Sequence, residues 1–243
     1  FNYFIQSNAK FIFGPAKWVR FLIKPEDGMA LAYVDYSQQE FGIAAALSED
    51  KAMQEAYQSG DPYITFAKQS GVVPDDATPE THPRERAQFK TCALGTQYGL
   101  GSEGLAQKLG QPVETGRQLL RHHRNCYQGY WKWNHDTVAT AILLQEMQTV
   151  MGWKMNVPAR ISASEGPNMR SLANFPMQAN GSEMLRVAVI KAHELGVEIC
   201  ATVHDALLIQ APLESIEKKA QDTQHAMEEA SELILNGFRL KTD

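Results

Sequence analysis

Cysteine is scarce in this sequence, and long apolar segments are missing. The three cysteines, Cys92, Cys126 and Cys200, are scattered and lack the spacing of metal ligands, so we expect reduced thiols rather than a disulfide framework. No apolar run approaches the roughly 20 residues that a helix needs to cross a bilayer, and the sequence has no recognisable signal peptide. We therefore expect a cytoplasmic protein without a membrane partner.

An initiator methionine is also missing, because the sequence begins at Phe1. We therefore expect a part of a longer chain. The composition, with 44% hydrophobic and 21% charged residues, is that of an ordinary globular protein, and 243 residues suffice for one or two domains.

The chain has no excess of positive charge, which weakly disfavours a nucleic-acid partner. Its net charge is −5. Basic residues nevertheless gather between Arg84 and Lys132, whereas residues 214–232 are rich in glutamate. A basic middle segment can still present one positive face, so the net charge does not exclude nucleic-acid binding.

The hydrophobic pattern predicts strands toward both ends of the chain and helices in the middle. An apolar run over 29–35 predicts a buried strand that ends at Asp35, and two runs separated only by His204 and Asp205 predict a hairpin over 197–211. The predicted helices cover 38–47, 84–98, 103–109, 114–128, 130–148, 179–195 and 213–235.

Three further local features are expected. Ser48 is a candidate cap for the helix that follows 38–47. Residues 149–170 are expected to be strand and loop, and residues 237–240 a last short strand. The order of elements predicts an α+β protein, in which a helical insertion interrupts one sheet-based domain.

Two aspartates lie at the ends of predicted strands. Asp35 ends the strand over 29–35, and Asp205 lies at the tip of the hairpin, 170 positions later. If the two strands are neighbours, the carboxylates converge and repel each other unless protons or cations neutralise them. A pair of Mg²⁺ ions would hold them and support phosphoryl transfer. Taken singly, each aspartate could equally be a solvated turn residue.

A basic helix is the second candidate site. Arg86, Lys90 and Leu94 are spaced by four and lie on one helical face, with Tyr98 one turn further on. Arg86 and Lys90 could bind a polyphosphate, and Tyr98 could stack on a base. The alternative is a solvated basic face with Leu94 in the core.

Together these segments resemble the DNA polymerase I family (family A). The run from Asp35 to Glu40, DYSQQE, resembles the first palm motif, and Arg86 to Gly99 resembles the fingers motif RxxxKxxxFGxxYG. Val203 to Asp205 resembles the start of the second palm motif, VHDE. Residues 170–178 resemble RxxxNxPxQ, and residues 104–110 resemble GLAxxLG. The motifs follow the order of the family, and the joint match is far more specific than any one of them.

The resemblance implies a right-hand polymerase: an antiparallel palm sheet packed with helices, and a helical fingers insertion. The palm is expected at 1–48 and 145–243, with the second palm motif at about 197–211. The fingers are expected at 49–144, with their motif helix at about 84–99. The thumb is absent from this sequence, so we expect a thumb, and optionally an exonuclease domain, in a longer parent. That parent is expected to be a monomer of a bacterial cell or a phage-infected host.

The resemblance also implies a template-directed DNA polymerase that joins a dNTP to a primer 3′-hydroxyl and releases pyrophosphate. Asp35, Asp205 and the backbone carbonyl of Tyr36 are expected to bind two Mg²⁺ ions, which Mn²⁺ can replace. Lys90 is expected to protonate the leaving pyrophosphate, and Glu40 to exclude a ribose 2′-hydroxyl. The expected nucleotide-binding residues are Gln38, Glu40, Tyr63, Arg86, Lys90, Leu94 and Tyr98. The expected contacts to primer–template DNA are Arg170, Asn174, Gln178 and His204.

The sequence departs from the family at five positions, none of them a metal ligand. Leu94 replaces an aromatic residue beside the nucleotide sugar, and Tyr63 replaces a histidine. Gly42, Ala206 and Glu183 stand where the family usually has Arg, Glu and Asp.

Three other functions stay open. A single-subunit RNA polymerase is disfavoured by Glu40 and its motif. A silent nucleic-acid-binding module is disfavoured because Asp35, Asp205, Arg86 and Lys90 are all present. A metal nuclease would have no use for the basic helix.

Overall fold

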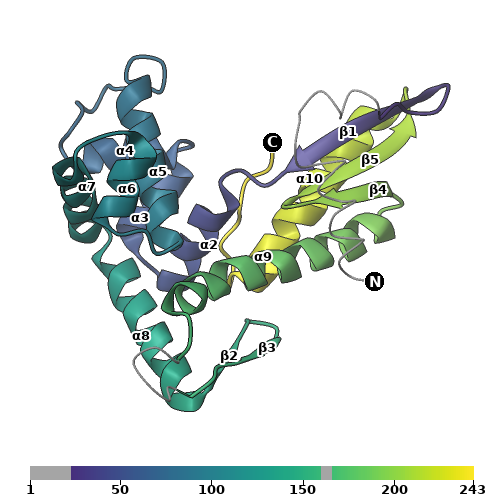
Figure 1. Cartoon of the computed structure of the whole chain (residues 1–243). Coiled ribbons are helices and arrows are strands. Elements are labelled where there is room, and N and C mark those ends of the chain that lie inside the picture. Colours follow the sequence, from purple (N-terminus) through teal and green to yellow (C-terminus); the bar gives the residue numbers. More distant parts are fainter. Residues whose placement is uncertain (1–22, 160–165) are drawn as a thin grey trace. The chain divides into compact units, whose positions relative to one another are not determined.

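The computed structural model describes residues 23–159 and 166–243. Mixed helices and antiparallel strands confirm the predicted α+β class (Figure 1). The elements are β1 (Met29–Asp35), α2 (Gln39–Ser48), α3 (Lys51–Gln58), α4 (Pro62–Gln69), α5 (Pro83–Gln97), α6 (Ser102–Leu109), α7 (Val113–Cys126), α8 (Gln128–Leu144), β2 (Glu146–Gln148), β3 (Lys154–Asn156), α9 (Met169–Glu194), β4 (Glu198–Val203), β5 (Ala206–Pro212) and α10 (Ile216–Ile234).

The chain forms two compact units. We call them the sheet unit and the helical unit. The sheet unit comprises the described residues up to Ser37 together with Met184–Leu233 and Arg239–Asp243. The helical unit comprises Gln38–Glu183 and Ile234–Phe238. These compact units do not follow the bounds predicted for palm and fingers, because residues 38–48 and 145–183 belong to the helical unit. Compactness does not define a functional subdomain, so the division into palm and fingers stays a prediction.

The sheet unit is built on a three-stranded antiparallel sheet in the order β1-β5-β4. Strands β4 and β5 form the predicted hairpin, in which Val203 pairs with Ala206. Alternating residues of β5, Leu207 and Ile209 among them, are fully buried. Helix α10 and the second half of α9 lie beside the sheet (Figure 1) and supply small and flexible buried side chains, including Ala188 and Met227. Burial of this apolar surface stabilises the unit.

The end of the chain differs from the sequence-based prediction. Residues 237–240 form no strand. Instead, Thr242 forms an isolated antiparallel bridge with Tyr36, and the backbone of Asp243 exchanges hydrogen bonds with that of Asp35. The predicted strand was therefore misplaced by a few residues. The residues that become extended are those that pair with the segment after β1, and these are Thr242 and Asp243.

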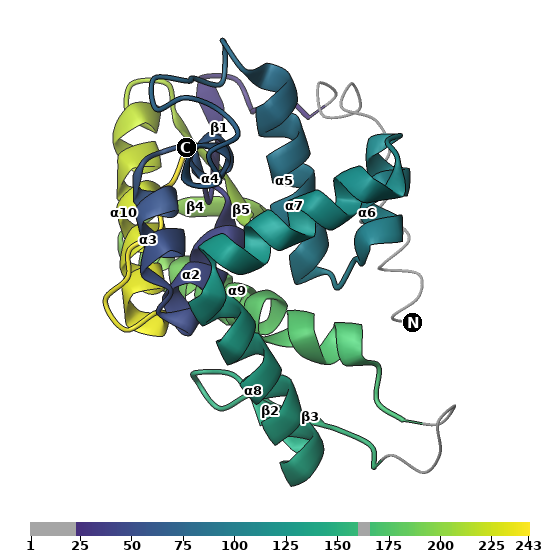
Figure 2. The same cartoon turned by 90° about the vertical axis from the view of Figure 1, so that its left-hand side faces the viewer.

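The helical unit has an aromatic core. Phe66 contacts Phe89 edge to face, with ring centroids 4.6 Å apart, and lies 4.9 Å from the ring of Tyr127. These rings come from α4, α5 and the junction of α7 with α8, so they join the helices that carry the predicted nucleotide site. Helices α5, α6 and α7 pack next to one another (Figure 2).

His123 belongs to the same core. It is fully buried, and burial lowers the pKa of its imidazole to about 3, so the ring is neutral. Its Nδ1 atom accepts a hydrogen bond of 3.0 Å from the indole nitrogen of Trp131. This histidine therefore has a structural role.

Helix α9 begins at Met169, ten residues before the predicted start. The prediction was wrong because Pro176, which lacks an N–H and normally interrupts a helix, lies inside it. Asn168 starts the helix instead: its side-chain oxygen accepts hydrogen bonds from the backbone of Arg170 and Ser171. The early start places 170–178 on one continuous helix.

Two other local predictions were wrong. Asp50, not Ser48, caps α3, because its carboxylate accepts from the backbone of Met53 at 3.1 Å and also from that of Tyr130. Helix α8 ends at Leu144, where Gln145 adopts a left-handed φ of 56°, and residues 146–148 form a strand paired with 154–156.

The remaining predicted elements agree with the structure within a few residues at each end, except that part of the strand and loop predicted over 149–170, namely 160–165, lies outside the described residues. All three cysteines are free in the structure, and Cys92 is buried. Within 23–159 and 166–243, no helix combines the length and apolar character that crossing a membrane requires.

Candidate active site

The two aspartates lie at the same end of the sheet, Asp35 as the last residue of β1 and Asp205 in the turn that leads into the neighbouring strand β5. Asp35 is the last residue of β1 and pairs with Ala206, the first residue of β5. The backbone N–H of Tyr36 donates to the carbonyl oxygen of Asp205 at 3.3 Å. The sequence separation of 170 positions is therefore closed by strand pairing, as predicted.

The electrostatics of the pair favour a bound cation. Burial, and next the negative charge of Asp205, raise the pKa of Asp35 to about 6. The Oδ1 atom of Asp35 is buried without a hydrogen-bond partner in the described structure. A buried, unpaired carboxylate oxygen next to a second carboxylate is costly unless the group is protonated or a positive ion accompanies it. The donor set, all oxygen, suits Mg²⁺.

Asp243 is a third acidic residue near the pair, and its charge also raises the pKa of Asp35. Among the described residues, no group of three or more His, Cys, Asp or Glu side chains could hold a metal ion. Any ion bound here would therefore take backbone, water or substrate oxygens as its other ligands. Tyr36 is buried beside the pair, and its hydroxyl donates to the carbonyl of Met227 at 2.5 Å, which fixes the start of the segment after β1.

The predicted phosphate-binding helix is α5. Its Arg86 forms an ion pair with Asp61, with 2.5 Å between Nε and the carboxylate. Arg86 and Lys90 both face the ring of Tyr63, with their charged atoms 5.8 Å and 5.5 Å from the ring centroid. Burial, and then the charge of Asp61, raise the pKa of Tyr63 to about 12, so its hydroxyl stays protonated. The structure thus brings Arg86, Lys90 and Tyr63 together. Such proximity is necessary if the three residues are to bind one triphosphate.

A second group joins three helices of the helical unit. The hydroxyl of Tyr98 and the side-chain amide of Gln178 both donate to the carboxylate of Glu40. The amide of Gln178 also lies 3.1 Å from the Tyr98 hydroxyl. These residues come from α2, the end of α5 and α9, and are as far as 138 positions apart. The carboxylate of Glu40 is thereby held in one orientation.

The other predicted residues of the helical unit do not contact Glu40 directly and have partners of their own. Asn174 donates to the carbonyl of Gln97 at 3.3 Å. The aliphatic part of Arg170 lies against Gly99, where an added Cβ would come within 2.7 Å of Arg170 Cγ. Leu94 is half-buried on α5.

Two predicted residues have unusual backbone geometry. Gln38, just before α2, has a φ of 46°, and His204, in the turn of the β4–β5 hairpin, has a φ of 56°. Left-handed φ values are unfavourable for residues other than glycine and persist where surrounding structure or function holds them. This geometry is consistent with a functional role for both residues.

Sequence reasoning missed two residues that organise the site. Asp61 caps α4 through the backbone of Tyr63 and Ile64, besides binding Arg86. Gln97 is fully buried and donates to the carbonyl of Glu40 at 3.4 Å. The Asp61-Pro62 pair is a recognisable helix start, so the cap could have been found. The partner of Gln97 could not, because it is 57 positions away.

Fold and site together have the organisation of a polymerase domain, with two carboxylates on an antiparallel sheet and a basic helix in a helical unit. Comparison with known proteins agrees. The family model described as DNA polymerase family A matches residues 15–241. This chain belongs to that family.

Individual relatives are consistent with this membership. The chain is 28% identical to the thermostable DNA polymerase I of Thermus caldophilus over 218 residues. This alignment covers 86% of the chain and 26% of that protein. It is 27% identical to DNA polymerase I of Deinococcus radiodurans, over 86% of the chain and 22% of that protein. The chain thus spans about a quarter of the length of these relatives.

A solved structure shows the same fold. It is the POL domain of Pol1 from M. smegmatis in complex with DNA primer-template and dNTP. The TM-score is 0.76 and the identity 27%, over 90% of this chain and 39% of that one.

Proposed function

We propose that this chain carries the catalytic residues of a template-directed DNA polymerase. The observation that carries the proposal is the pairing of β1 with β5, which sets Asp35 and Asp205 side by side on an antiparallel sheet. Family membership and the motifs support the same activity.

In the proposed reaction, the oxygen of the primer 3′-hydroxyl attacks the α-phosphorus of the dNTP. The new P–O bond forms as the bond from the α-phosphorus to the β-phosphate oxygen breaks, so pyrophosphate leaves. The hydroxyl proton passes to water, and Lys90 donates a proton to the pyrophosphate. Two Mg²⁺ ions held by Asp35, Asp205 and the carbonyl of Tyr36 would stabilise the charge that develops on the attacking and leaving oxygens.

The residues of the helical unit bind and select the nucleotide in this proposal. Arg86 and Lys90 bind the triphosphate, with Tyr63 packed against both cations. Glu40, held by Tyr98 and Gln178, blocks a ribose 2′-hydroxyl, so deoxynucleotides are preferred. The same contact disfavours a single-subunit RNA polymerase. Gln38 and Leu94 also contact the nucleotide, and Tyr98 stacks at the templating base.

Primer–template DNA is the proposed macromolecular partner. Arg170, Asn174 and Gln178, spaced by four along α9, present one row of side chains to it. His204, next to Asp205, contacts the primer terminus. Affinity for DNA is expected to fall steeply with salt, since phosphate contacts supply much of it.

Primer extension tests the proposal. The assay contains a primed template, four dNTPs and Mg²⁺ at low salt, with Asp205→Ala as the control. Template-dependent extension by the chain, lost in Asp205→Ala, is the expected result. If neither this chain nor a longer protein that contains it extends the primer, the proposal is wrong.

A further inference from the structure

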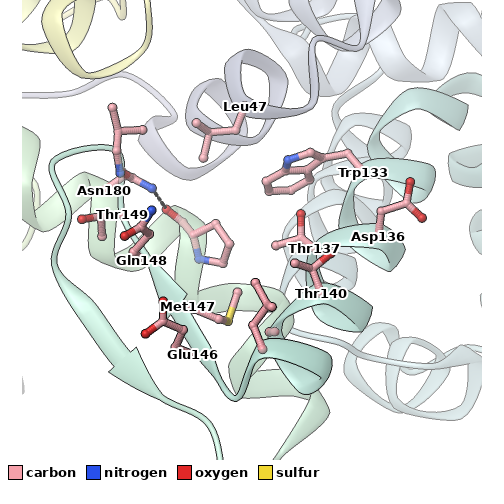
Figure 3. Close-up of a pocket in the computed structure, with 14 residues that line it drawn as sticks. Leu47, Trp133, Asp136, Thr137, Thr140, Glu146, Met147, Gln148, Thr149 and Asn180 are labelled. Atoms are coloured by element: carbon pink, nitrogen blue, oxygen red, sulfur yellow. Dashed lines mark hydrogen bonds between the residues drawn. The ribbon is translucent and has the colours of Figure 1, made fainter.

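A cavity of about 650 Å³ lies in the helical unit, with helix α8 on one side and strand β2 on the other (Figure 3). We call it the Trp133 cavity. The α8 residues that line it recur every three or four positions and therefore share one helical face, among them Trp133, Asp136, Thr137 and Thr140. The opposite side is formed by the consecutive residues 146–150.

The Trp133 cavity lies along the edge of β2 and not against one of its faces. Neighbouring residues of a strand point to opposite faces, yet each residue of 146–150 contributes to the lining. Strand β2 pairs with β3 on its other edge, and it has no second strand partner among the described residues. The edge of β2 that borders the cavity is therefore open.

The backbone hydrogen bonds show which polar groups reach the open edge. The N–H of Thr149 donates to the carbonyl of Trp153 at 3.0 Å, which continues the pairing of β2 with β3. In an antiparallel ladder every second residue bonds to the partner strand, so Met147 also directs its backbone groups to β3. The residues in between, Glu146 and Gln148, direct their N–H and carbonyl groups to the open edge.

Asn180 already occupies one position of a third strand. Val150 continues the alternation of Glu146 and Gln148, and its N–H donates to Oδ1 of Asn180 at 2.9 Å. Asn180 is buried, lines the cavity, and donates a second hydrogen bond of 2.7 Å to the carbonyl of Pro176. Its side chain thus takes the place of a peptide group beside Val150. An extended peptide would continue this pairing along β2, since open strand edges bind further strands.

The side chains of the cavity indicate a ligand with a basic residue. Asp136 and Glu146 contribute two carboxylates, and none of the residues that line the cavity is a lysine or arginine. Lys154 of β3 contacts Glu146 at 3.2 Å, but both side chains are exposed, and such pairs are weak in water. The indole of Trp133 adds an aromatic face over which a lysine or arginine can lie. The buried Met147 makes the floor apolar.

We propose that the Trp133 cavity is a docking site for an extended, basic segment of another protein, which adds to β2 as a third strand. The backbone of this segment pairs with Glu146 and Gln148. Its lysine or arginine side chain lies over Trp133 near Asp136, and its aliphatic side chains pack on Met147. The proposal goes beyond the polymerase function and does not depend on it.

Selection from random peptides supplies the probe. Short random peptides displayed on phage are selected for binding to the chain, and the selected peptides are synthesised with a fluorescein label. We expect sequences with a lysine or arginine among β-branched and aliphatic residues, and few carboxylates. Fluorescence anisotropy then gives the Kd of each peptide.

Two adjacent residues of α8 give a matched pair of variants. Thr140 lines the Trp133 cavity, whereas Ala139 lines a separate cavity beside Trp131, and both are exposed. Thr140→Arg places a cation where the peptide's own basic side chain would lie, and should weaken binding by roughly ten-fold or more. Ala139→Arg adds the same charge outside the cavity and should change the Kd by less than about two-fold. Circular dichroism melting shows that both variants keep the fold.

The pairing with β2 is tested on the peptide itself. Methylation of a backbone nitrogen removes its N–H, and in an added strand only alternate residues donate to β2. Two peptides are therefore methylated at two alternate positions each, one in either register. The peptide methylated on the side of β2 loses two hydrogen bonds and should bind roughly ten-fold or more weakly, whereas the other should stay within about three-fold.

The inference is overturned if selection yields no peptide that Thr140→Arg weakens more than Ala139→Arg does. Equal binding of the two methylated peptides would also overturn it, because the ligand would then not be a strand. Complete displacement of the peptide by spermidine at the same concentration would assign the cavity to small cations instead. A dimer in light scattering that Thr140→Arg dissociates would assign it to a second copy of this chain, and the inference would again be wrong.

Discussion

Arg86 and Asp61 form an ion pair of 2.5 Å that joins the start of α5 to the start of α4. The contact uses the Nε atom of Arg86 and leaves both terminal nitrogens of the guanidinium to other acceptors. Because an arginine has five N–H donors in a rigid plane, a carboxylate on one edge can orient it toward a phosphate on the other. We infer that Asp61 positions Arg86 for the triphosphate.

Asp61→Asn is expected to raise the KM for dNTP by about two- to five-fold with little change in kcat, the range of one partly exposed ion pair. The asparagine oxygen can still cap α4, so the melting temperature should hardly change. Asp61→Ala is the control, because it loses the cap as well and should also melt at a lower temperature. A lower KM in Asp61→Asn would mean that the carboxylate competes with phosphate instead.

Glu40→Ala is expected to raise ribonucleotide incorporation, because the carboxylate that blocks the 2′-hydroxyl is removed. The structure adds a second variant. Tyr98→Phe removes one of the two hydrogen bonds that orient Glu40 and should relax selectivity in the same direction by a smaller factor. The ratio of deoxy- to ribonucleotide kcat/KM measures both. An unchanged ratio in Glu40→Ala would refute the steric role.

Gly99→Ala is expected to lower both stability and template affinity. Gly99 has a φ of 71°, and an added Cβ would meet Arg170 at 2.7 Å. The control is Gly71→Ala, since Gly71 has a φ of 68° and open space around it. Both variants should lose about 1 kcal/mol to backbone strain. Only Gly99→Ala should also weaken the binding of primer–template DNA, because Arg170 must move. Equal DNA affinities would show that this position of Arg170 is unimportant.

In the metal-free chain, Asp35 is expected to contribute a loss of stability as pH rises from about 4 through about 6. The pKa of the Asp35 carboxyl has its ordinary value of 3.8 in the unfolded chain and is about 6 in the folded one, so the folded state holds more protons in this window. Asp35→Asn should therefore reduce this loss, and should be the more stable protein at pH 8 but not at pH 3. Urea unfolding with EDTA at several pH values measures this. Parallel curves for the two proteins would contradict the raised pKa.

The sequence by itself indicated the family and most of the local elements, although not the bounds of α3 and α4. Residues 29–35 and 197–211 carry their strand and turn pattern in consecutive residues, and the motifs around Asp35, Arg86 and Asp205 follow a fixed order. Local geometry depends on neighbours in the chain, so such patterns can be read directly. The same reasoning placed the start of α9 ten residues too late. Pro176 is a local signal against a helix, and tertiary packing overrode it.

Only the tertiary structure decided the partners. Nothing near Glu40 in the sequence indicates Gln178, and nothing near Arg86 indicates Asp61. It also decided that Trp131 and Trp133, two positions apart, line different cavities. These contacts arise where separate helices pack. Packing depends on the shape of the whole core, which cannot be predicted from the neighbours of one residue in the sequence.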